Sequence, residues 1–425
     1  MIRTKPLTGS QTGLATAYEN ACSSKKWPFV DTAFNWSLYL ALGASCVSNL
    51  RMTPSGPALM MERGSGGYPF LYEIGIVGVL CVVVFKILAG VPFTNLKDRW
   101  DFWILNLFYI PIFLNFFLFS GDSSEFFGGG QLRLQLEIWL LGLCLIAYPP
   151  SKQTVVRAIY LVIIMAVVNN LQAILAFFGL VSPVYKIAYR ENLLFRHSGF
   201  MQMPGHLGVL SAVAVAWSLW FQKNRFIAIA VATVCVFGIY LADSRTAIVA
   251  SCTVIVLKFL TNLHLKYKTK HIIFCIFVII FTPFIFFAPE STWSNSRPMS
   301  ILAAIQIWSD NVLGVPWGSF GKYNPYPLLA VSPHNWPAIS LLHGGILSFL
   351  PVVFAHIFII KSLKLYHTNN HLSYKFLFII IAITISSWFE QVLQNSNAAF
   401  MFILLITFLS AEQYALKYEK REIFP

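Results

Sequence analysis

The sequence predicts an all-α membrane protein that crosses the bilayer about twelve times. Three observations lead to this fold class. Of the 425 residues, 57% are hydrophobic and only 11% are charged, which excludes an ordinary soluble globular protein. Apolar runs of roughly 15 to 25 residues recur along the chain, and a bilayer-spanning helix needs about 20. Short turns that carry Lys and Arg separate many of these runs, as in polytopic membrane proteins.

The predicted spans divide the chain into four parts. Residues 1–33 form a cytoplasmic N-terminal arm without an apolar region close behind its positive residues, so we expect no cleaved signal peptide. Residues 34–287 hold the first nine spans, 288–337 form one large loop with short helices, and 338–425 hold the last three spans and a cytoplasmic tail. The spans are expected to begin near Phe34, Phe70, Trp103, Leu136, Val155, His206, Phe226, Thr246, Ile272, Ala338, Phe376 and Ala398.

The basic residues predict the orientation of these spans. If the N-terminus is cytoplasmic, most of the 30 Lys and Arg residues fall in cytoplasmic turns, as the positive-inside rule requires. An even number of spans returns the C-terminus to the cytoplasm, so the loop 288–337 faces outward. The basic residues left on the outer side are Arg51, Arg63, Arg133, Lys186, Arg190, Arg196, Arg245, Arg297 and Lys322.

Two of these outer arginines lie directly beside apolar spans. We expect Arg51, Arg63 and Arg133 to be solvated in loops or to extend toward water. Arg196 and Arg245, by contrast, lie close to hydrocarbon, where a guanidinium is costly unless it has a partner or lines a polar cavity. An ion pair with Asp243 is the alternative for Arg245. The planar guanidinium binds phosphate oxygens through two hydrogen bonds, so a lipid-linked pyrophosphate is a suitable ligand for such a group.

Other ligand classes have no support in the sequence. The net charge of +13 does not indicate nucleic acid, because no basic stripe with interleaved aromatic residues occurs. No phosphate-binding glycine loop of a nucleotide site is present. No acidic D-x-D pair lies in an outer loop, so we expect neither a metal nor another cofactor. Six of the seven cysteines lie in apolar segments and none forms a C-x-x-C motif, which argues against disulfides and structural zinc.

The polar stretch 290–348 is the expected centre of the chemistry. Ser294 to Pro298 is typical of a helix start, with Pro298 at the first helical position, and Asp310 with Asn311 would end that helix. The glycine-rich run from Gly314 to Gly321 would let backbone approach a ligand closely. His334 then precedes a further apolar helix.

Four short motifs between Arg196 and Ser348 resemble those of the O-antigen ligase and polymerase superfamily of bacterial membrane enzymes. Arg196-His-Ser-Gly-Phe with Pro204 is similar to its R-x-S-G-x(4)-P element, and Ser244-Arg245 resembles its S-R motif. Arg297 followed by the run Leu313 to Phe320 is similar to its arginine helix and PLGVGxGxF loop.

The fourth motif lies at the start of the tenth predicted span. His334-Asn335 with Gly345 and Ser348 resembles H-(N/S/Q)-x9-G-x-x-(G/T/Y), with Ser348 where Gly, Thr or Tyr is usual. Val312 also replaces the usual Pro before Leu313, and neither departure changes a charged group. The match extends from Arg196 to Ser348, and the earlier residues agree only in their pattern of spans.

The resemblance implies a glycosyltransferase of the bacterial inner membrane whose active site faces the periplasm. Such an enzyme uses an undecaprenyl-diphosphate-linked glycan as donor, without a nucleotide sugar or metal. We expect an O-antigen ligase, which transfers the polysaccharide to lipid A–core during lipopolysaccharide biosynthesis. The alternative within the superfamily is a polymerase whose acceptor is a lipid-linked repeat unit. A flippase or transporter is a third reading, but it would need no base beside its arginines.

The resemblance also assigns roles to individual residues. His334 would be the general base, because a neutral imidazole can accept the proton of the acceptor hydroxyl as it attacks with inversion. The alternative for His334 is a loop histidine bonded to backbone. Arg196, Arg245 and Arg297 would bind the pyrophosphate and would disfavour the charged imidazolium. Asn335, His197 and Glu390 could support the site, and His343 is expected to be structural.

Overall fold

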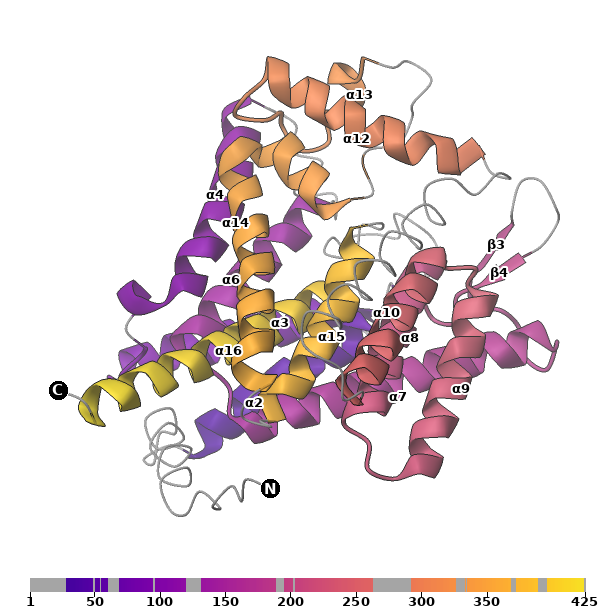
Figure 1. The fold of residues 1–425 in the computed structure, drawn as a ribbon, viewed down its shortest axis with the longest axis horizontal. Helices are drawn as coiled ribbons and strands as arrows, with labels where there is room; N and C mark the ends of the chain where they lie inside the picture. Colours follow the sequence, from indigo (N-terminus) through magenta and orange to yellow (C-terminus); the bar gives the residue numbers. More distant parts are fainter. Residues whose placement is uncertain are drawn as a thin grey trace.

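The computed structural model describes most of the chain and shows a mostly helical protein. The described residues are 28–119, 131–188, 195–262, 292–325, 333, 335–367, 372–388 and 396–423, apart from 49, 54, 60–68, 95 and 202. The main helices are α2 (Pro28–Ser45), α3 (Leu71–Leu88), α4 (Trp100–Phe119), α6 (Gln131–Ala147), α7 (Lys152–Phe177), α8 (Pro204–Trp220), α9 (Arg225–Leu241), α10 (Arg245–Asn262), α14 (Trp336–His367), α15 (Leu372–Ser387) and α16 (Ser396–Ile423) (Figure 1).

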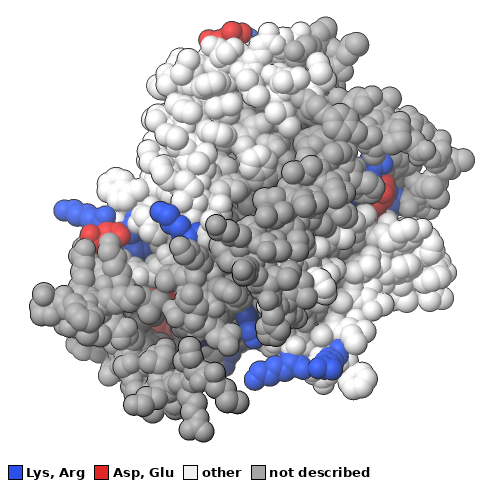
Figure 2. Space-filling view, in the orientation of Figure 1, with Lys and Arg blue, Asp and Glu red and all other residues white. Residues whose placement is uncertain are grey.

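These helices coincide with the predicted spans, except for the span near Ile272, which lies outside the described residues. Five of them, α3, α4, α7, α14 and α16, are long and apolar enough to cross a membrane, and α8, α9 and α15 are shorter apolar helices. The described residues therefore form a helical, membrane-embedded protein. Figure 2 shows that the charged side chains of the described residues on one face lie in a few small groups, and that the upper part of this face is largely uncharged below its topmost group.

Helix starts follow from local sequence. Pro204 begins α8, where its missing N–H has no intrahelical partner to lose. Ser151 caps α7 by accepting a hydrogen bond from the Thr154 N–H, and Asn224 caps α9 in the same way. Asp310 ends the helix of the large loop, as expected.

That helix, α12 (Thr292–Asp310), begins earlier than the sequence predicts. The prediction that Pro298 occupies the first helical position is wrong, because the helix already starts at Thr292. A proline in a helix interior loses one backbone hydrogen bond and crowds the carbonyl one turn back, which is why it usually indicates a helix start. A short helix, α13 (Phe320–Tyr323), follows the loop after α12.

Two small antiparallel hairpins depart from the all-α expectation. In the first, β1 (Leu50–Thr53) pairs with β2 (Gly56–Leu59), with Leu50 opposite Leu59. In the second, β3 (Lys186–Ala188) pairs with β4 (Phe195–His197), with Ile187 opposite Arg196. Both hairpins join successive helices. A short 3-10 helix, η1 (Leu96–Asp98), connects α3 to α4.

The helix ends gather at two opposite ends of the molecule. We call them the α12 end, which holds the α9–α10 turn and the start of α14, and the α8–α9 end, which holds the loop between those helices (Figure 1). At the α12 end, the Ser48 N–H donates to the Phe200 carbonyl at 3.0 Å. At the α8–α9 end, the Thr94 N–H donates to the Ala147 carbonyl at 3.1 Å.

Two ion pairs lie deep at the α8–α9 end. The fully buried Arg99 donates to both carboxylate oxygens of Asp101, at 2.9 and 2.6 Å. Lys86 in the last turn of α3 pairs with Asp31 in the first turn of α2 at 2.6 Å. Pairing is needed here, because an unpartnered buried charge is strongly destabilising.

Arg133 is also paired, which corrects the expectation of a solvated or extended side chain. Its guanidinium, at the start of α6, binds the carboxylates of Glu73 on α3 and Glu137 one turn along α6. The guanidinium of Arg51 lies over the ring of Phe70, 4.2 Å from its centroid. Partners from other segments therefore contact both Arg51 and Arg133.

Candidate functional site

Arg196 holds the turn between α9 and α10. Its Nε donates to the Ala242 carbonyl at 2.7 Å, and a terminal guanidinium nitrogen donates to the Asp243 carbonyl at 2.9 Å. Asp243 has φ of 46° and, among the described residues, is the one non-glycine with positive φ. Such a backbone conformation persists only where surrounding contacts fix it. The guanidinium of Arg196 therefore donates its hydrogen bonds to the protein's own backbone.

The residues after Arg196 fold tightly over α7. Gly199 has φ of 61°, and a Cβ at this position would collide with the backbone of Asn169. Asn169 is fully buried; its side-chain oxygen accepts from the Phe200 N–H at 3.0 Å and its nitrogen donates to the Cys46 carbonyl. The close approach of the backbones at residues 199 and 169 therefore requires glycine at 199. Asn169 was not among the predicted site residues.

Arg245 is the first residue of α10, directly after the turn that Arg196 holds. Ser244 is buried, and its hydroxyl accepts from the Ala247 N–H at 3.4 Å. Gly208 on α8 leaves room for Ser244, since a Cβ there would collide with the Ser244 side chain. The expected alternative, an ion pair between Arg245 and Asp243, does not form, and Arg245 has no hydrogen bond or ion pair with any described residue.

The loop between α12 and α13 is fixed to a break in α14. Gly345 has φ of 60° and ψ of −156°, which interrupts the helix, and a Cβ there would collide with Val312 and Leu313. Gly314 has φ of 85°, and its Cβ would lie 2.9 Å from the Gly345 nitrogen. The two glycines therefore permit the same close approach of two backbones, a conformation and spacing that other residues do not tolerate.

Hydrogen bonds from three segments stabilise this contact. The Val315 N–H donates to the Leu342 carbonyl at 2.7 Å. Asn115 on α4 donates to the carbonyls of Leu313 and His343, at 3.2 and 3.1 Å. Asn115 therefore joins the loop, α4 and α14 at one point.

His343 and Ser348 have structural partners. The buried His343 has its Nδ1 3.1 Å from the Val315 carbonyl oxygen, and its ring centroid lies 4.5 Å from that of Trp317. Ser348 donates to the Phe108 carbonyl at 2.7 Å. His343 thus supports the loop, as predicted. Ser348, at the motif position where Gly, Thr or Tyr is usual, joins α14 to α4.

Asn335 connects the start of α14 with the end of α15. Its side-chain oxygen accepts from the Ala338 N–H at 2.9 Å, and its nitrogen donates to the Trp388 carbonyl. One turn before Trp388, Ile385 packs against a small apolar cluster that includes Ala247, in the first turn of α10. The end of α15 therefore lies between the first turn of α10, which begins at Arg245, and Asn335.

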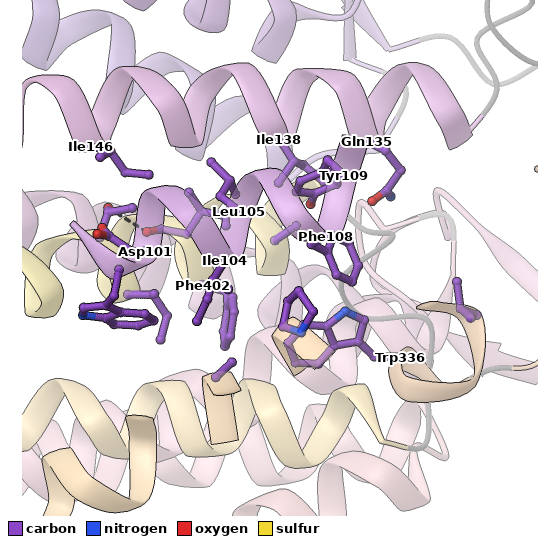
Figure 3. A pocket seen from close by; sticks show the side chains of 18 of the residues that line it. Asp101, Ile104, Leu105, Phe108, Tyr109, Gln135, Ile138, Ile146, Trp336 and Phe402 are labelled. Carbon is purple, nitrogen blue, oxygen red and sulfur yellow. Dashed lines mark hydrogen bonds between the residues drawn. The ribbon is translucent and has the colours of Figure 1, made fainter. Parts of the chain in front are cut away.

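A mostly apolar cavity lies between α4, α6, α14 and α16 (Figure 3). Trp317 of the loop and Trp336 at the start of α14 line part of it. Asp101 lines it as well, on the side of the α8–α9 end. Gln135 on α6 also lines the cavity, and its amide nitrogen is buried without a hydrogen-bond partner in the described part of the chain. The cavity thus reaches the residues that support the loop.

The remaining predicted site residues are placed only in part. His334 and Glu390 lie outside the described residues. Arg297 lies on α12, but its side chain is not among those described. His197 is buried, with its ring edge-on to Phe177 at 5.8 Å between centroids. The structure therefore brings Arg196, Arg245 and Asn335 to the same end of the molecule as the loop.

In the described part of the chain, no group of three or more His, Cys, Asp or Glu side chains could hold a metal ion. A scan of the chain against protein-family models finds no match, and a search of curated proteins finds none with significant sequence similarity. The local geometry at the α12 end is therefore the basis for a functional proposal.

Proposed function

We propose that this protein is a membrane glycosyltransferase that acts on a lipid-linked diphosphate glycan. Within that class we propose an O-antigen ligase, which transfers the glycan from undecaprenyl diphosphate to lipid A–core. The observation that carries the proposal is the state of Arg245. Its guanidinium has no partner among the described residues, and the turn before it is held by a second arginine.

An unpartnered arginine at a helix start is well suited to an anion. Ser244 accepts from the Ala247 N–H, while the N–H groups of Arg245 and Thr246 have no intrahelical acceptors, and the helix dipole favours negative charge at that end. A guanidinium adds two parallel donors in a fixed plane, which fits two oxygens of one phosphate. Arg196 contributes by holding the Ala242 and Asp243 carbonyls, so it positions Arg245 rather than taking the same role.

The second support is the set of contacts through α15 that connects Asn335 with the start of α10. Through Trp388 and Ile385, the end of α15 joins the start of α14 to the first turn of α10. His334 is the neighbour of Asn335 in the sequence, so we assign it the base. The apolar cavity beside Trp317 and Trp336 offers a place for part of an isoprenoid chain.

The proposed reaction moves one proton and one glycosyl group. The acceptor hydroxyl loses its proton to His334 while its oxygen attacks the anomeric carbon of the donor sugar. The bond between that carbon and the diphosphate oxygen breaks with inversion, and the electron pair leaves with undecaprenyl diphosphate. Arg245 stabilises the negative charge that develops on the leaving diphosphate. Arg297, on α12, is assigned to the same diphosphate.

The proposal includes a topology. The α12 end would face the periplasm of a bacterial inner membrane, with about twelve spans in total and both termini in the cytoplasm. The basic turns at the α8–α9 end support this orientation, because Lys223 and Arg225 lie there, exposed to solvent.

A deletion strain tests the proposal and separates its two forms. Loss of a ligase removes all O antigen from the core and leaves lipid-linked polymer in the membrane. Loss of a polymerase leaves a core that carries a single repeat unit. Unchanged lipopolysaccharide banding, with complementation confirmed by protein level, would contradict both forms.

A further inference from the structure

A second group of basic residues lies at the α8–α9 end, far along the helices from the proposed catalytic site. The ammonium of Lys258, near the end of α10, lies 4.1 Å from the ring centroid of Trp220, the last residue of α8. Lys375, in the first turn of α15, lies 5.9 Å from the ring centroid of Phe221. Trp220 and Phe221 are neighbours in the chain, so the two ammonium groups lie over adjacent aromatic residues.

Stacked aromatic rings hold the two lysines in place. Trp220 is stacked on Phe378, with 3.4 Å between ring centroids, and Tyr374 lies edge-on to Trp220 at 5.7 Å. Trp220 is 8% exposed, and its indole N–H has no hydrogen-bond partner among the described residues. The packed aromatic rings therefore keep the two ammonium groups near each other and limit their separation in solvent.

Among the described residues, neither Lys258 nor Lys375 forms an ion pair with a carboxylate. Residues 192–242, 246–289 and 311–389 contain no Asp or Glu, and these stretches include the whole of α8, α9 and α15 and all of α10 after its first residue. Glu412 on α16 lies one turn after Phe408, whose ring packs on Phe376 of α15, but Glu412 forms no ion pair with Lys258 or Lys375. An external anion would therefore neutralise the two ammonium groups.

We infer that Lys258 and Lys375 bind the phosphate of an anionic phospholipid headgroup at this end of the protein. Basic pockets between membrane helices on the cytoplasmic side favour anionic headgroups. The partly exposed ring of Phe221 supplies a surface for the glycerol and upper acyl groups, which a free phosphate ion would not use. The headgroup would join α8, α10 and α15, the helices that also position Arg245.

The experiment uses the full chain in a neutral detergent and native mass spectrometry. Phosphatidylglycerol, phosphatidylcholine and inorganic phosphate serve as the probes. The double substitution Lys258→Gln with Lys375→Gln should weaken phosphatidylglycerol binding about thirty-fold, because each lysine contributes about fivefold near an anionic headgroup. Lys223→Gln with Arg225→Gln removes the same charge from exposed positions at the same end and should weaken binding by less than about threefold.

Three results would overturn the inference. The first is an equal loss in both double variants, which would indicate a general effect of charge. The second is equal binding of phosphatidylcholine and phosphatidylglycerol by the wild-type protein. The third is binding of inorganic phosphate as tight as that of the lipid. Lys258→Arg with Lys375→Arg should retain binding, and if the Gln pair does not fold, Lys375→Gln alone should still show about a fivefold loss.

Discussion

Gly314 and Gly345 face each other where the α12–α13 loop meets the break in α14. Both have positive φ, and a Cβ on Gly314 would lie 2.9 Å from the Gly345 nitrogen. The contact fixes the loop to the helix that begins directly after residue 335. Substitutions at this contact should therefore test the stability of the loop without changing the arginines to which the chemistry is assigned.

Gly345→Ala should destabilise the protein. An alanine must adopt a backbone conformation that is nearly restricted to glycine, at a cost of about 1–3 kcal/mol, and its Cβ must also displace the loop backbone at Val312 and Leu313. Thermal unfolding in detergent measures the effect as a lower Tm. Gly321→Ala is the matched control, because no atom lies within 4 Å of its Cβ. Equal Tm values for the two variants would contradict the close backbone contact.

Arg196 and Arg245 should fail in different ways when replaced. Arg196→Gln removes two charged hydrogen bonds to the α9–α10 turn and should reduce stability by about 2 kcal/mol. Arg245→Gln removes no bond to any described residue, so its Tm should stay near that of the wild type while donor binding weakens. Thermal unfolding and donor binding on the same preparations check this. A drop in Tm for Arg245→Gln alone would reverse the two roles.

Arg245→Lys tests the shape of the cation. Lysine keeps the charge and loses the planar fork, so we expect weaker donor binding and roughly tenfold slower transfer at matched protein level. Arg225→Lys is the control, because Arg225 is likewise the first residue of its helix, α9, and lies exposed at the opposite end. Wild-type activity for Arg245→Lys would show that two-pronged phosphate binding at this position is wrong.

The expected topology predicts opposite accessibility for two loop positions. Single cysteines at Ser296 and Asn369, introduced after the seven native cysteines have been replaced, should react with a membrane-impermeant thiol reagent from the periplasmic and the cytoplasmic side respectively. Reaction of both from one side would contradict the twelve-span arrangement, and the proposed periplasmic reaction with it.

Local patterns in the sequence predict much of this fold. The apolar runs locate the long helices, and the glycine-rich run from Gly314 to Gly321 predicts close backbone approach, which Gly314 makes to the backbone of Gly345. These signals depend only on residues near one another in the chain, so no knowledge of packing is needed. Pro298 misled the prediction, because α12 already begins at Thr292 and Pro298 falls in its second turn.

Partners from distant segments could not be predicted. Asn115 lies in an apolar helix, and its bonds to Leu313 and His343 exist only once α4 packs on α14. Arg133 finds Glu73 across two helices, which turns an expected solvated charge into a paired one. Asn169 likewise meets Gly199 only through the packing of α7. Polar residues inside apolar runs are the one sequence signal that could have identified these positions.

The most direct test of the account is transfer of glycan in vitro by the wild-type protein and by His334→Ala. Purified undecaprenyl-diphosphate-linked glycan and lipid A–core serve as donor and acceptor, and donor binding is measured separately. Removal of a positioned base lowers the rate by about a hundred- to ten-thousand-fold, so we expect no detectable product from His334→Ala while donor binding and Tm are retained. The wild-type protein should remain active in EDTA. Near-normal turnover by His334→Ala, or no turnover by the wild-type protein with either this acceptor or a lipid-linked repeat unit, would contradict the proposed glycosyl transfer.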